Sequence, residues 1–182
     1  PFQFEVINFL NNFDCLNFIG QLQINPLSIR KYEYILFDSF SELVDSKFKL
    51  PNKKVFFTVK GDVNLNKLEK KGGDYLKQLD LSEISEIYTE VFDQLWNKYH
   101  CNIYFILCPT KFDTRNYYKE RSYKIAKSIK EISEKKRYLK FIQLEEKEII
   151  QSSTDKFPYH FDEKTIEKYS ALLASEINSK NH

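Results

Sequence analysis

A run of apolar residues, Ile103-Tyr104-Phe105-Ile106-Leu107-Cys108, decides the fold class of this chain. A strand that is apolar on both sides of its pleat is typical of a parallel sheet with helices on both faces. Residues 81–99 before it and 117–135 after it have the apolar spacing of amphipathic helices. Residues 138–143 then predict another strand, and residues 163–178 a last helix. This alternation indicates an α/β fold, three-layer α/β/α with a mostly parallel central sheet.

The first half of the chain has shorter and more scattered signals. Residues 32–37 and 55–59 are rich in aromatic and β-branched side chains and predict two strands. Residues 4–11 predict a short helix, and residues 15–24 alternate between apolar and polar as a strand does. Residues 62–79 are polar and contain a glycine pair, so we expect a long loop or a marginally structured excursion there.

Two of the predicted helices begin with capping signals. Asp80 and Glu83 have the spacing of a capping box at the start of helix 81–99. Asp162 directly precedes the last helix and is expected to cap it. The buried face of the first of these helices is expected to comprise Ile84, Ile87, Val91, Leu95 and Tyr99. For the last helix we expect Ile166, Tyr169, Leu173 and Ile177.

Composition excludes several classes of protein. A chain of 182 residues fits one domain, residues 1–182. Its 28 basic and 26 acidic side chains give a net charge of only +2, so we expect no nucleic-acid partner. No apolar run approaches the roughly 18 residues of a membrane span. Cys15, Cys101 and Cys108 lie in or beside apolar stretches without metal-site spacing, which favours reduced thiols, no metal, and a cytoplasmic location.

Ligand sites of open α/β sheets lie beyond the carboxyl ends of the strands. That rule selects the polar segments 38–41, 60–62, 109–115 and 151–160 as the candidate surface. His160 lies in the last of these and is the histidine best placed to act as a general base. Asp155 is the expected carboxylate partner, because Asp162 serves the helix start. An ordinary solvated histidine near a helix start is the alternative.

A nucleophile for such a base is not evident from the residues. Ser39 follows a strand and is a candidate for substrate or oxyanion binding, although turn and cap roles are commoner for serine. Lys111 and Arg115 are candidates for binding an anionic group of a substrate. Cys108 lies in apolar surroundings that raise a thiol pKa. The chain has no Gly-x-Ser-x-Gly elbow.

The stretch Asp155-Lys-Phe-Pro-Tyr-His160-Phe, followed by a helix with Tyr169, resembles the last block of SGNH/GDSL-type hydrolases. In the usual pattern Asp and His are three positions apart, whereas five separate them here. Tyr32-Glu-Tyr-Ile-Leu-Phe-Asp38-Ser-Phe and Pro158-Tyr-His160-Phe are similar to a strand and a loop of a bacterial branch of that superfamily. Members of this branch often carry a Gly-Ser-Cys segment on their first strand.

The resemblance implies one SGNH-like, flavodoxin-like domain and serine-type ester chemistry without a cofactor. The substrate would be an acylated small molecule, a carbohydrate or a surface polysaccharide. In this register the chain begins just after the first strand, and the nucleophile is expected upstream of Pro1. Two alternatives stay open: a non-catalytic α/β module of the same ancestry that binds a glycan or a protein, and a nucleotide or phosphate enzyme, which only the fold class supports.

Overall fold

The computed structural model describes the central and C-terminal parts of the chain. Side chains are described for residues 33–40, 43 and 80–179, and the backbone alone for residues 46–49, 56–59 and 74–76. The helix expected at 4–11 and the strand expected at 15–24 lie outside these described residues.

The chain divides into two compact units. One comprises residues 1–31 and 44–78, and the other comprises residues 32–43 and 79–182. The single domain expected over residues 1–182 stays a prediction.

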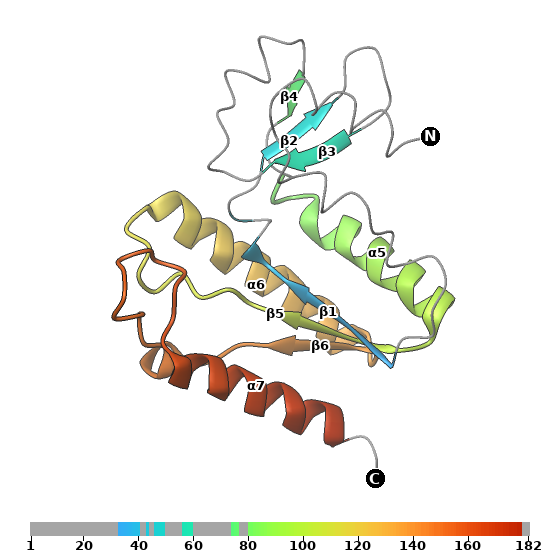
Figure 1. Cartoon of the computed structure of the whole chain (residues 1–182). Helices are drawn as coiled ribbons and strands as arrows, with labels where there is room; N and C mark the ends of the chain where they lie inside the picture. The colour runs from blue at the N-terminus through green and yellow to red at the C-terminus, as the bar shows by residue number, and fades with distance from the viewer. Residues whose placement is uncertain are drawn as a thin grey trace, which may run out of the picture. The chain divides into compact units, whose positions relative to one another are not determined.

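The second unit is built on a parallel sheet of three strands in the order β1-β5-β6 (Figure 1). These strands are β1 (Tyr34–Asp38), β5 (Asn102–Ile106) and β6 (Leu139–Ile142). Tyr34 lies opposite Asn102, and Ile103 lies opposite Leu139. β5 is therefore the central strand of this sheet.

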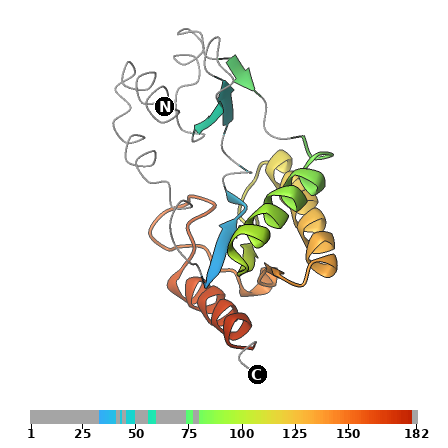
Figure 2. The same cartoon turned by 90° about the vertical axis from the view of Figure 1, so that its right-hand side faces the viewer.

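Three helices alternate with these strands: α5 (Ile84–Tyr99), α6 (Asn116–Lys135) and α7 (Glu163–Asn178). α5 and α6 cover one face of the sheet and α7 covers the other (Figures 1 and 2). The side chains of β5 alternate accordingly. The Phe105 ring packs against Phe92 of α5, while burial, together with the Glu176 carboxylate of α7, raises the pKa of Tyr104. The fold is α/β with helices on both faces of a parallel sheet, of the flavodoxin- or Rossmann-like type, and the expected fold class is confirmed.

The buried face of α5 differs from the expected stripe. Ile84 and Phe92 are fully buried, and the Tyr88 ring lies 5.7 Å from the Phe105 ring. Ile87 and Val91 are each 37% exposed, so their predicted burial is wrong. Aromatic rings bury more apolar area than Ile or Val, which favours turning the helix so that these rings meet the sheet.

The two predicted helix caps have different outcomes. Asp162 Oδ1 accepts a hydrogen bond from Thr165 N at 2.9 Å, which confirms its role at the start of α7. α5 begins three residues later than expected, at Ile84, and Glu83 provides no side-chain cap. Asp80 instead accepts from the backbone N–H and the hydroxyl of Ser82. A short polar side chain can satisfy itself within its own turn in this way, and here the turn replaces the expected capping box.

The first unit contains an antiparallel sheet in the order β3-β2-β4. Its strands are β2 (Ser46–Lys49), β3 (Phe56–Val59) and β4 (Asp74–Leu76). β3 confirms the strand expected at 55–59. The loop expected over 62–79 is wrong at β4, because a strand of three residues is too short to show a period and is specified by its pairing with β2.

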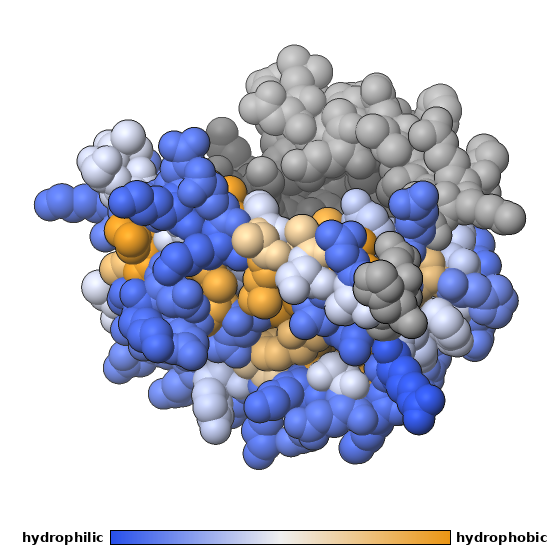
Figure 3. All heavy atoms as spheres, turned by 90° about the horizontal axis from the view of Figure 1, so that it is seen from below, coloured by the Kyte–Doolittle hydropathy of each residue, from blue (hydrophilic) through white to orange (hydrophobic). Residues whose placement is uncertain are grey.

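Some apolar side chains remain at the surface. Ile166 of α7 is 57% exposed, so its expected burial is wrong. The neighbouring residue Thr165 is buried in its place, and its hydroxyl accepts a hydrogen bond from Ile150 N. Leu36 of β1 is 47% exposed. The face seen from below carries apolar residues in its middle, bordered by hydrophilic ones (Figure 3).

None of the helices described is long and apolar enough to cross a bilayer.

Candidate functional site

A hollow of about 510 Å³ lies beyond the carboxyl ends of β1 and β5. We call it the histidine pocket; its lining includes Asp38, Phe40, Cys108, Phe157, Tyr159 and His160. Asp38 is the last residue of β1 and Phe40 follows that strand, Cys108 follows β5, and the other residues come from the loop before α7. The pocket therefore lies where ligands bind in open α/β sheets.

His160 and Asp155 form a hydrogen-bonded pair beside this pocket. His160 Nδ1 lies 2.8 Å from Asp155 Oδ2. The hydrogen bond from His160 and that from the Phe157 backbone lower the pKa of Asp155, so its carboxylate is the acceptor and Nδ1–H the donor. In the neutral ring this leaves the lone pair on Nε2, which has no hydrogen-bond partner among the described residues. The side chain of His160 is 58% exposed, so the free nitrogen belongs to an accessible ring.

The loop that carries the pair is closed by local hydrogen bonds. Asp155 Oδ1 accepts from Phe157 N at 2.8 Å, and Phe157 O accepts from His160 N at 3.1 Å. Ser152 N donates to His160 O at 2.8 Å, next to a bridge between Gln151 and Phe161. These turns bring residues five positions apart to hydrogen-bonding distance. The irregular spacing of Asp155 and His160 is therefore compatible with a paired arrangement.

A buried carboxylate anchors the same loop to the loop after β5. Asp113 is 1% exposed and accepts hydrogen bonds from Tyr159 Oη and from Arg115 Nε, the latter at 2.9 Å. Arg115, which also stacks over Tyr118, lowers the pKa of Asp113. Burial and the Asp113 carboxylate raise the pKa of Tyr159, so its hydroxyl stays protonated and donates. This cluster fixes the residue that precedes His160.

Ser39 ties the ends of β1 and β5 together. Its side chain is fully buried, and its hydroxyl accepts a hydrogen bond from Cys108 N at 2.8 Å. Its backbone N–H donates to Ile106 O at 3.1 Å. Burial, with a smaller effect of Asp38, raises the pKa of Cys108 to about 12, in the direction that its apolar surroundings predict.

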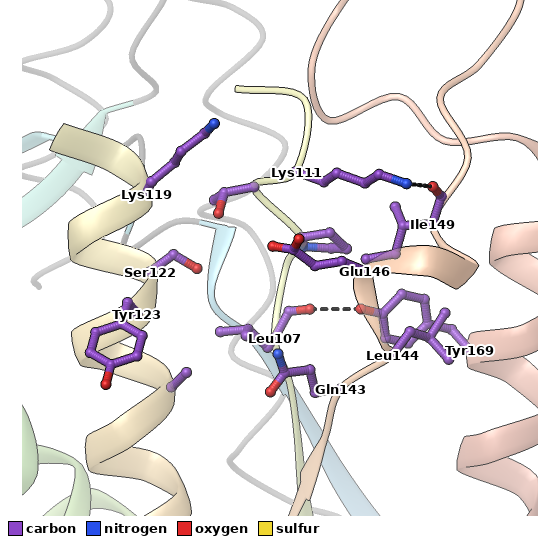
Figure 4. A pocket seen from close by; sticks show the side chains of 13 residues that line it. Leu107, Lys111, Lys119, Ser122, Tyr123, Gln143, Leu144, Glu146, Ile149 and Tyr169 are labelled. Carbon is purple, nitrogen blue, oxygen red and sulfur yellow. Dashed lines mark hydrogen bonds between the residues drawn. The ribbon is translucent and has the colours of Figure 1, made fainter. Parts of the chain in front are cut away.

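Lys111 lies in a second hollow of about 270 Å³ (Figure 4). This Lys111 pocket is lined by Thr110, Lys111, Lys119, Ser122, Glu146 and Tyr169, among others. Lys111 Nζ donates to Ile149 O at 2.7 Å, and Tyr169 Oη donates to Leu107 O at 3.0 Å. Leu107, Pro109 and Tyr169 line both pockets.

The structure therefore brings together only part of the predicted site. His160 and Asp155 are paired, whereas Ser39, Lys111 and Arg115 contact other groups of the protein, and their substrate-binding roles stay predictions. Sequence reasoning missed the contact between Asp113 and Tyr159. Both residues lie in segments that the sequence indicates as candidate surface, 109–115 and 151–160. No local sequence pattern predicts a contact between positions that are 46 residues apart. Within the described residues, no three His, Cys, Asp or Glu side chains gather in a way that could hold a metal ion.

Comparisons with protein-family models, with curated proteins and with solved structures found no match.

Proposed function

We propose that this chain is an SGNH-like esterase or O-acyltransferase whose substrate is an acylated carbohydrate, such as a surface polysaccharide. The observation that supports it best is the 2.8 Å contact between His160 Nδ1 and Asp155 Oδ2 beside the histidine pocket. A histidine oriented by a carboxylate, with its second nitrogen free, is the arrangement that general-base catalysis of acyl transfer requires.

In this mechanism His160 Nε2 takes the proton of a hydroxyl nucleophile as its oxygen attacks the ester carbonyl. In the SGNH hydrolases that the chain resembles, this hydroxyl belongs to a residue of the first strand. The bond to the leaving alcohol then breaks, and the imidazolium returns the proton to that alcohol. Asp155 stays ionised and stabilises the imidazolium between these steps. Water or a second alcohol releases the acyl group by the same route, giving hydrolysis or transfer.

The proposal is tested by turnover of chromogenic esters and acetylated oligosaccharides with the natural, full-length protein. We expect His160→Ala to lower kcat/KM at least about 100-fold, because general-base catalysis contributes factors of that size. Asp155→Ala should lower kcat/KM as well. The matched control is Lys156→Ala, an exposed position in the same loop, which should leave turnover unchanged.

Equal turnover by wild type and His160→Ala would remove His160 from the chemistry. The alternative is a module that binds a glycan or a protein without turnover, and the half-exposed ring of Phe157 at the pocket favours it. That alternative predicts no turnover by any variant, together with retention of the wild-type protein on a glycan surface.

A further inference from the structure

We infer that the histidine pocket receives the acyl chain of the substrate, and that this chain is longer than acetyl. The inference rests on the proposed function and adds the chemical class of the acyl group. It follows from the size of the pocket, from the residues that line it and from the hydrogen bonds that those residues already make.

The size of the pocket fits a ligand larger than an acetyl group. Its volume of about 510 Å³ is within the range of small-molecule sites, about 300–1,000 Å³. Rings line much of it: the Phe40 ring lies 5.1 Å from the Tyr159 ring, and the Phe157 ring lies 4.8 Å from His160. Ile106 and Leu107 add aliphatic surface where β5 ends.

The side-chain hydroxyls of the pocket lining already donate hydrogen bonds within the protein. The hydroxyl of Tyr159 donates to Asp113, and the hydroxyl of Tyr169 donates to Leu107 O. Each of these residues therefore offers the pocket its ring. Asp38 Oδ1 accepts from Phe40 N, and the Cys108 thiol stays protonated.

This lining discriminates between the two parts of an acylated sugar. A sugar ring has a hydroxyl on most of its carbons, and each of these needs a polar partner once it leaves water. An alkyl chain needs none and gains free energy from contact with the rings. The Asp38 carboxylate also disfavours an anionic ligand, so a neutral ester fits better than a free fatty acid. The geometry thus points to the alkyl part in the pocket, next to the base that activates the attacking hydroxyl.

The first arm of the test is the dependence of turnover on acyl-chain length. Nitrophenyl acetate, butyrate, hexanoate and octanoate are compared with the full-length protein, and kcat/KM is expected to rise about two- to fourfold per methylene. Phe157→Ala should flatten this rise, and folding should survive because the side chain is 48% exposed. Ile166→Ala removes an exposed apolar side chain of α7 outside the pocket and should leave the rise unchanged.

The second arm measures binding without turnover. Octanamide and acetamide are neutral, inert analogues of the two extreme esters, and calorimetric titration should show octanamide binding at least about tenfold more tightly. One outcome is that octanamide binds, that Phe157→Ala weakens this binding, and that no ester is turned over. It would support binding of an alkyl chain in the histidine pocket and refute the esterase function. Turnover that is flat or falls with chain length, with octanamide binding no tighter than acetamide, would overturn the inference while the esterase stands. A rise that Phe157→Ala leaves intact would also overturn it.

Discussion

Asp113 shows how single residues position the candidate base. Its buried carboxylate accepts from Tyr159 on one side and from both the side chain and the backbone of Arg115 on the other. A buried charge is tolerated only when it is hydrogen-bonded in this way. Because Tyr159 is adjacent to His160 in the chain, the same contacts hold the loop that carries the His160–Asp155 pair. Asp113 is therefore a positioning residue.

We expect Asp113→Asn to lower the free energy of unfolding by about 2 kcal/mol at neutral pH, since hydrogen bonds to a charged group are lost. The pKa of Asp113 is lowered in the folded protein. Its contribution is therefore complete above the unfolded pKa of about 3.9 and is lost as the pH falls below that value. The stability gap between wild type and variant should shrink in that range, as measured by urea unfolding of the full-length protein at a series of pH values.

Glu120→Gln is the control for this measurement, because Glu120 is an exposed carboxylate on α6. Its effect should stay within about 0.5 kcal/mol at every pH. A gap for Asp113→Asn that stays constant or widens on acidification would contradict the ionised, hydrogen-bonded state of Asp113.

At the scale of elements, the site depends on how the ends of β1 and β5 are joined. Both strands run in parallel and end at the same edge of the sheet. Ser39 bridges them there through its buried hydroxyl and its backbone N–H. The bridge sets where Asp38 and Cys108 lie in the lining of the histidine pocket.

Ser39→Ala should lower the free energy of unfolding by about 1–3 kcal/mol, because the N–H of Cys108 is left without its buried acceptor. Urea unfolding measures this loss. Ser170→Ala, at an exposed position of α7, is the matched control and should change stability by less than about 0.5 kcal/mol. Unchanged stability of Ser39→Ala with a large rise in KM would instead place the hydroxyl on the substrate.

The elements that sequence predicts well are long and periodic. α7 spans Glu163–Asn178 as expected, since Asp162 caps it and an amphipathic pattern follows. The pairing of Asp155 with His160 could also be predicted from the sequence, because both residues belong to one loop. The sequence did not predict where α5 begins or which face of it is buried. A local turn at Asp80 sets the start, and the packing of aromatic rings on the sheet sets the buried face. The contact between Asp113 and Tyr159 depends on tertiary structure alone.

At the scale of the whole molecule, the unit of residues 32–43 and 79–182 gathers its polar loops at one edge of the sheet. β1, β5 and the loop before α7 all contribute to the histidine pocket there. This arrangement is general to α/β folds and does not by itself assign a reaction. We propose the reaction from the His160–Asp155 pair, which in that mechanism activates a hydroxyl.

The most direct test is labelling of the natural, full-length protein with a fluorophosphonate, which needs no knowledge of the substrate. An activated hydroxyl attacks the phosphorus, fluoride leaves, and His160 takes the proton. Intact mass spectrometry should show one adduct on wild type and on Lys156→Ala, and none on a folded His160→Ala protein. Wild-type protein that stays unlabelled, or His160→Ala that is labelled as fast as wild type, would contradict activation of a hydroxyl by the His160–Asp155 pair.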